Sequence, residues 1–62
     1  MKLTLKAARV NKGLTQGEAA QRLGITVGTL SYYERGVTKP TVDMIEKILA
    51  LYELNYDNIN WQ

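Results

Sequence analysis

The apolar residues of this 62-residue chain recur every three to four positions, and no segment alternates convincingly with the period of two that is typical of strands. The first pattern predicts a helix that ends at Gly13, because this spacing brings side chains onto one helical face. Its apolar positions are Leu3, Ala7, Val10 and Leu14.

A second helix is predicted to begin after Thr15. Glu18 follows Thr15 at the spacing of a capping box, in which each side chain accepts a hydrogen bond from the backbone N–H of the other residue. Gly24 is the expected end of this helix. The apolar stripe between these points consists of Ala19, Ala20 and Leu23.

Two further helices are predicted in the middle of the chain. One begins at Thr26, a good N-cap residue, and runs to about Glu34. A loop follows, because Pro40 disfavours helical backbone at Lys39. Thr41 can then cap a longer helix, whose expected inner face is Val42, Ile45, Ile48, Leu49 and Tyr52.

The last residues are predicted to form a fifth, short helical turn, "YDNI", capped by Asn55 and carrying Asp57 near its positive end. The chain has no internal repeat, linker or low-complexity segment. The sequence therefore predicts an all-α fold of five helices with short connections, forming a single domain over residues 1–62.

The composition argues against an enzyme. The chain has neither cysteine nor histidine. Disulfides, thiolate metal sites, the commonest general base and the commonest metal ligand are therefore missing. We expect no catalytic residues, no metal, no cofactor and no small-molecule ligand.

No apolar run approaches the roughly 18 residues of a membrane span. The N-terminal residues also lack the continuous apolar stretch of a signal peptide. A cytoplasmic location without a membrane partner is the expectation.

Charge is distributed unevenly along the chain. Residues 1–42 hold seven basic and two acidic side chains, a net +5, whereas residues 43–62 carry a net −3. A basic face can concentrate a polyanion. An ordinary solvated surface is the alternative, and charge alone does not separate the two.

The second and third predicted helices are separated only by Gly24, Ile25 and the cap Thr26, which forces a sharp angle between them. This segment and its flanks contain a characteristic set of residues: Leu14-Thr15-Gln16, Ala20, Leu23-Gly24-Ile25-Thr26, Leu30, Glu34-Arg35-Gly36 and Lys39-Pro40. With this set, residues 5–59 resemble the lambda-repressor-like helix-turn-helix family of bacterial regulators.

The resemblance implies a recognition helix in the major groove of double-stranded DNA and a preceding helix across the backbone. The implied DNA contacts are Thr15, Gln16, Thr26, Val27, Gly28, Thr29, Tyr32, Thr38 and Lys39, with Lys12 and Arg35 as electrostatic helpers. Glu34 opposes the dipole at its helix end, so a compensating cation is expected. The resemblance implies that this cation is Arg9, in a structural ion pair.

The recognition helix lacks the long polar side chains that usually discriminate bases. Val27 and Gly28 stand at two of the outward positions. We expect direct base contacts to be modest, with Gln16 and DNA shape supplying much of the rest. The alternative for Val27 and the tyrosines is burial in the core; Tyr33 is the residue for which we prefer it, while Val27 and Tyr32 are expected outside.

The C-terminal residues 54–62 are predicted to be a short turn followed by a dimerisation tail. Trp61 has little chain left to cover it, so it either folds back on the core or meets a partner. The expected homodimer contacts are Leu54, Tyr56, Ile59 and Trp61. Glu53 stands where the family often has glycine.

The sequence thus predicts a nucleoid-associated transcriptional regulator, a repressor that binds an inverted-repeat operator as a homodimer. The alternative is a protein-interaction module of the same fold, such as an antitoxin, an anti-repressor or a coactivator-like adaptor. The sparse recognition helix favours the alternative, and the basic first part of the chain with Gln16 favours DNA binding.

Overall fold

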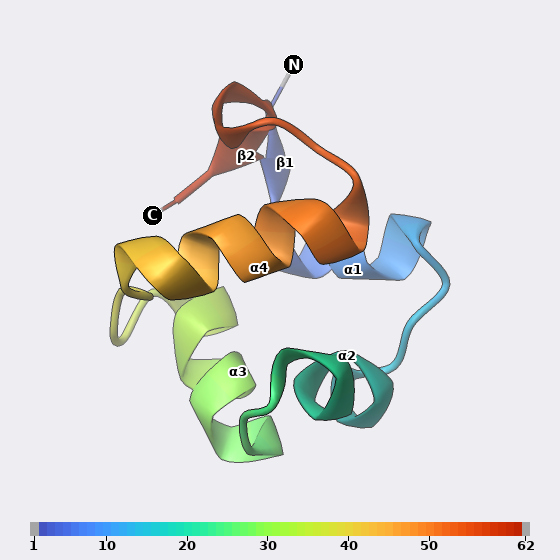
Figure 1. Cartoon of the computed structure of the whole chain (residues 1–62), viewed down its shortest axis with the longest axis vertical. Helices are drawn as coiled ribbons and strands as arrows, with labels where there is room; N and C mark the ends of the chain where they lie inside the picture. The colour runs from blue at the N-terminus through green and yellow to red at the C-terminus, as the bar shows by residue number, and fades with distance from the viewer. Residues whose placement is uncertain (1, 62) are drawn as a thin grey trace.

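A computed structural model of the chain describes residues 2–61. It has four α-helices, one short 3-10 turn and two very short strands (Figure 1). In chain order, the elements are β1 (Leu3–Thr4), α1 (Leu5–Asn11), α2 (Gln16–Leu23), α3 (Val27–Arg35), α4 (Val42–Tyr52), η1 (Tyr56–Asn58) and β2 (Ile59–Asn60).

Every α-helix begins in the same way, after a threonine whose hydroxyl oxygen accepts a hydrogen bond from a backbone N–H one turn ahead, at 3.0–3.2 Å. Such a bond satisfies one of the amide groups that a helix start leaves without a partner. At Thr15 the Glu18 carboxylate also accepts from the Thr15 N–H at 2.9 Å, which completes the predicted capping box. The four caps are Thr4, Thr15, Thr26 and Thr41.

Residues with left-handed backbone end three of the helices. Gly24 (φ +73°) ends α2 and allows the sharp turn into α3. Glu53 (φ +56°) ends α4 and is the one non-glycine residue with positive φ in the described part of the chain. Its side chain carries an ion pair with Lys12 at the end of α1.

The core lies between α4 and the other three helices; in Figure 1, α4 passes in front of α1 and above α2 and α3. Leu30 of α3, Ile48 of α4 and Ile59 of β2 are the largest fully buried side chains. Ala19 and Ala20 of α2 are also buried, and their small size allows α2 to approach α3 and α4 closely. Around this centre lie Leu5, Ala8, Leu23 and Tyr52.

Two expected inner positions face solvent. Val42 is 71% exposed. It is the first residue of α4, and the buried residues of this helix, Ile48 and Tyr52, lie in its second half. Val10 is 56% exposed, because α1 buries the face of Leu5, Ala8 and Arg9 instead.

The prediction of a fifth helix is wrong. Residues 56–58 form one 3-10 turn, in which the Asn58 side-chain oxygen accepts from the Asn55 N–H at 2.8 Å. The chain then continues as β2, which runs parallel to β1 with Leu3 opposite Ile59 and Thr4 opposite Asn60. The two ends of the described chain are thereby held together, at the top of Figure 1. None of the described helices is both long and apolar enough to cross a membrane.

Candidate nucleic-acid interface

The α2–α3 unit has the geometry of a helix-turn-helix. Gly24 turns the backbone, and the Ile25 N–H donates to the Ala20 carbonyl at 3.0 Å, which closes the end of α2. Ala20, Leu23 and Leu30 are buried between the helices, with exposures of 1–3%. The crossing of the two helices is therefore held by apolar contact, and their outer faces stay available to a ligand.

The first turn of α3 is organised by two threonines. The Thr26 oxygen accepts from the Thr29 N–H at 3.1 Å, and the two hydroxyl oxygens lie 2.9 Å apart in a second hydrogen bond. Thr29 is half-buried and Thr26 is exposed. Both hydroxyls are thus engaged with each other before any ligand arrives.

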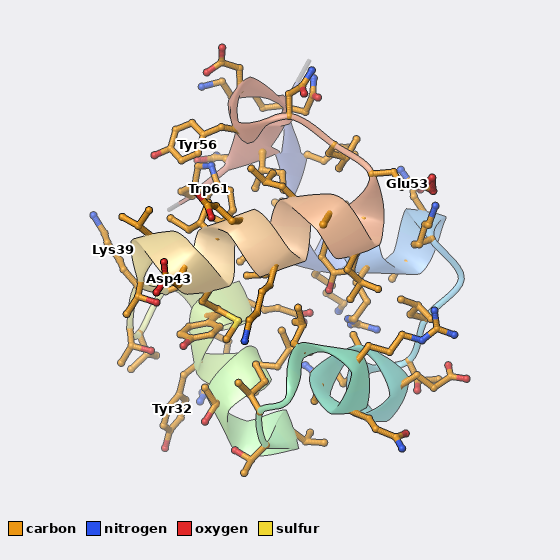
Figure 2. The ribbon with its side chains drawn as sticks, in the orientation of Figure 1. Tyr32, Lys39, Asp43, Glu53, Tyr56 and Trp61 are labelled. Carbon is orange, nitrogen blue, oxygen red and sulfur yellow. The ribbon has the colours of Figure 1, made fainter. Side chains whose placement is uncertain are left out.

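The outward surface of α3 is partly apolar. Val27 is 46% exposed and Tyr32 is 47% exposed, and Tyr32 projects away from the helix in Figure 2. Gly28 lies between them in the sequence, and a Cβ added there would meet nothing closer than the Thr26 hydroxyl at 3.9 Å. Tyr33, by contrast, packs against the core.

Arg35 lies next to Tyr32 on this surface, a contact that the distribution of charge along the sequence does not predict. Its guanidinium carbon lies 5.2 Å from the centre of the Tyr32 ring, within the range of a cation–π contact. The spacing of three residues on one helix could have suggested the pair. The contact places a fixed positive charge beside the exposed tyrosine.

The ion pair expected between Arg9 and Glu34 is present. The Arg9 Nε donates to Glu34 Oε2 at 2.7 Å, and Nη2 lies 3.3 Å from Oε1. A third bond runs from Nη1 to the Leu14 carbonyl at 3.0 Å. The hydrogen bond to Glu34 raises the pKa of Arg9 despite the opposing effect of burial. Arg9 therefore joins α1, the α1–α2 loop and α3.

Gln16 belongs to the same network. Its side-chain Nε2 donates to Glu34 Oε1 at 3.0 Å, which links the first residue of α2 to the last turn of α3. Gln16 is half-buried as a result. Sequence reasoning expected it only as a ligand contact.

An open hollow of about 550 Å³ lies in front of this network. Thr15 and Gln16 enter it from the start of α2, and Lys6 and Arg35 bring positive charge from α1 and α3. Sequence reasoning did not single out Lys6 or Ser31, because only the fold brings α1 to the start of α2. The full lining is Lys6, Arg9, Thr15, Gln16, Ser31, Glu34 and Arg35.

Thr38 and Lys39 lie apart from this hollow. Both are exposed in the α3–α4 loop, and Figure 2 shows Lys39 near the start of α4. The structure thus brings Thr15 and Gln16 together with Arg35, and leaves Thr38 and Lys39 as a separate exposed group.

Comparison with known proteins identifies this arrangement. The model of the helix-turn-helix family matches residues 5–59. The chain belongs to the lambda-repressor-like helix-turn-helix family. It is similar to the HTH-type transcriptional regulator ImmR of Bacillus subtilis (strain 168), with 43% identity over 53 residues, which is 86% of this chain and 42% of ImmR. The chain thus spans less than half the length of this relative. No solved structure matches it.

The C-terminal residues of this helix-turn-helix chain divide into buried and accessible ones. Ile59 is 1% exposed and lies in the core beside β1, so its expected role in a dimer contact is wrong. The Trp61 ring stacks on Tyr56 with 5.3 Å between ring centres, and its Nε1 donates to the Tyr56 carbonyl at 3.1 Å. Tyr56 is 54% exposed, whereas Leu54 and Trp61 are half-buried. Figure 2 shows Tyr56 and Trp61 on the same side of the molecule.

The described residues contain no cluster of acidic side chains that could bind a metal ion. Among residues 2–61, no group of three or more aspartates and glutamates is placed to hold an ion. The chemistry that the interface offers is hydrogen bonding, apolar contact and positive charge.

Proposed function

We propose that this chain binds double-stranded DNA in a sequence-specific manner and regulates transcription. The observation that carries the proposal is the outer surface of α3, where Val27, Gly28 and Tyr32 are exposed and free to meet a ligand. A helix of this placement fits the major groove while α2 crosses the backbone. The printed description of ImmR as a transcriptional regulator supports the same function.

The proposed contacts fall into three groups. Thr15 and the first amides of α2 bind a phosphate, with Lys6 and Arg35 adding positive charge. Thr26, Val27, Gly28, Thr29 and Tyr32 face the bases and the adjoining phosphates, Val27 against a thymine methyl group. Thr38 and Lys39 reach a more distant phosphate. Few of these residues discriminate bases strongly, so DNA shape contributes to the choice of site.

We also propose that residues 1–62 fold as one domain and act as a homodimeric repressor on an inverted repeat. The stacked pair of Tyr56 and Trp61 is the aromatic surface that supports a contact between two copies, and the half-buried Leu54 is a further proposed contact. Light scattering at tens of micromolar tests this: a mass of two chains supports the dimer, and a single-chain mass contradicts it.

The first experiment is selection of bound duplexes from a random pool, followed by sequencing. Enrichment of an inverted repeat supports the function, and the half-site spacing reports the dimer geometry. Salt dependence is the second measurement, because log affinity falls by about 0.9 per log salt for each phosphate neutralised. No enrichment with a folded protein contradicts DNA recognition.

The partly apolar face of α3 supports a second candidate, a protein-interaction module of the same fold. Val27 and Tyr32 would then contact a partner protein. Weak dependence of partner binding on salt, together with no enriched duplex, would favour this candidate over DNA binding.

A further inference from the structure

The side-chain amide of Gln16 has a fixed direction. Its nearest polar partner is Glu34 Oε1, at 3.0 Å from Nε2. An ionised carboxylate only accepts hydrogen bonds, so the NH₂ group of Gln16 and not its carbonyl oxygen must face Glu34. Chemistry therefore settles which end of the amide points inward.

Glu34 is itself held in place. Arg9 contacts both of its carboxylate oxygens, at 2.7 and 3.3 Å, and the Glu34 side chain is only 4% exposed. Arg9 is anchored in turn to the Leu14 carbonyl. The hydrogen bonds from Arg9 to Glu34 and from Gln16 to Glu34 thus restrain Gln16, which lines the hollow.

The carbonyl oxygen of Gln16 is left to a ligand. Within residues 2–61, no side chain or backbone group donates a hydrogen bond to it. Phosphate oxygens are acceptors and cannot bind it. In the major groove the groups that can donate to it are the exocyclic amines, N6 of adenine and N4 of cytosine.

We propose that Gln16 is a specificity-determining residue that selects a base pair by an exocyclic amine, and that Glu34 is the positioning residue that holds Gln16 for this contact. The proposal rests on the DNA-binding function proposed above. An unrestrained glutamine could turn its NH₂ group toward any phosphate, which is a contact without sequence information. The bond to Glu34 disfavours that orientation.

Duplex selection with three proteins tests the base contact: the wild-type chain, Gln16→Ala, and Gln21→Ala as a matched control on the exposed side of α2. We expect the wild type and the control to prefer adenine or cytosine at one position of each half-site, by about 5- to 10-fold. Gln16→Ala should lose that preference and keep the others. Uniform weakening with unchanged base preferences would overturn the proposal and leave DNA binding intact.

A measurement without DNA tests the positioning role. In the ¹H–¹⁵N spectrum of the free wild-type protein, the Gln16 side-chain amide protons should be shifted and exchange slowly, unlike those of Gln21. In the double variant Arg9→Met/Glu34→Leu, the Gln16 signals should move to the position of the Gln21 signals. Identical Gln16 and Gln21 signals in the wild type would overturn the positioning role. This outcome is separate from a wild-type chain that enriches no duplex, which would contradict the proposed function itself.

Discussion

Arg9 of α1 and Glu34 of α3 lie 25 positions apart in the chain and form a bidentate ion pair, with 2.7 Å between Nε and Oε2. Both charged groups are buried: Arg9 is 8% exposed and the Glu34 side chain is 4% exposed. Its third hydrogen bond, to Leu14, leaves little of the guanidinium without a partner. The pair thus fixes α1 against the helix-turn-helix.

Loss of Arg9 should be costly. Arg9→Ala leaves the Glu34 carboxylate buried without its cation, so we expect the free energy of unfolding to fall by about 3–5 kcal/mol. Urea titration followed by circular dichroism measures this difference. Arg9→Met/Glu34→Leu is the control, because it removes both charges and should recover most of the loss. A single-variant loss below about 1 kcal/mol would show that the pair is effectively solvated.

Tyr52 predicts a fall in stability at high pH. Burial, and then the negative charge of Glu34, raise the pKa of its hydroxyl from 10.0 to about 12, while Arg9 opposes this shift. The unfolded chain therefore loses this proton first. Ionisation of Tyr52 therefore leaves stability unaffected below about pH 10 and lowers the free energy of unfolding by about 2–3 kcal/mol as the pH rises through about 12.

Tyr52→Phe isolates this effect. The Tyr52 hydroxyl is buried without a hydrogen-bond partner in the described structure, so its removal should leave stability at pH 7 unchanged or raise it by about 1 kcal/mol. Thermal melts of both proteins from pH 7 to 12 make the comparison. Parallel curves over the whole range would show that the hydroxyl ionises equally well in the folded state.

Most of the helix limits could be predicted from residues that lie close together in the sequence. Glu18 at capping-box spacing from Thr15, and Gly24 before Thr26, identified the limits of α2 and α3, because caps and left-handed glycines act within a few residues. The all-helical class and the family are confirmed. The apolar pattern does not predict the Thr4 cap, because the pattern includes Leu3, which precedes Thr4.

The features that the sequence did not predict depend on contacts between segments that are distant in the chain. The two-residue strands β1 and β2 are too short to show a period of two, and only their pairing defines them. That pairing buries Ile59, which from sequence was indistinguishable from an exposed residue such as Tyr56. The bond between Gln16 and Glu34 likewise joins residues 18 positions apart: the short connection predicts a sharp angle between α2 and α3, but not which side chains that angle brings together.

The left-handed conformation of Glu53 predicts a stabilising substitution. Glu53→Gly removes the steric cost of φ +56° but also removes the ion pair with Lys12. The pair lies on the surface and is screened by salt. We therefore expect Glu53→Gly to melt at a higher temperature than the wild type at 1 M salt, and its advantage over the wild type to be smaller at low salt. Scanning calorimetry at two salt concentrations measures both. A lower melting temperature at high salt would contradict this account.

Gly17 and Gly28 offer a matched pair for separating stability from recognition. Each is the second residue of its helix, and a Cβ at either site would meet only the oxygen of the preceding cap threonine, at 4.0 and 3.9 Å. Alanine fits both sites without strain. We therefore expect Gly17→Ala and Gly28→Ala each to raise the free energy of unfolding by about 0.5–1 kcal/mol.

Their effects on DNA should differ, because Gly28 lies on the face of α3 that is proposed to meet the bases, whereas Gly17 of α2 has no proposed base contact. The new methyl group of Gly28→Ala would project from α3 toward the base edges, so duplex selection should show an altered base preference or a lower affinity. Gly17→Ala should keep the wild-type preferences, since α2 is proposed to cross the DNA backbone and Gln16, not Gly17, is its proposed base contact. If both variants gain stability and neither changes base preference, α3 does not approach the bases at Gly28. The apolar Val27–Tyr32 surface would then be better explained by a protein partner.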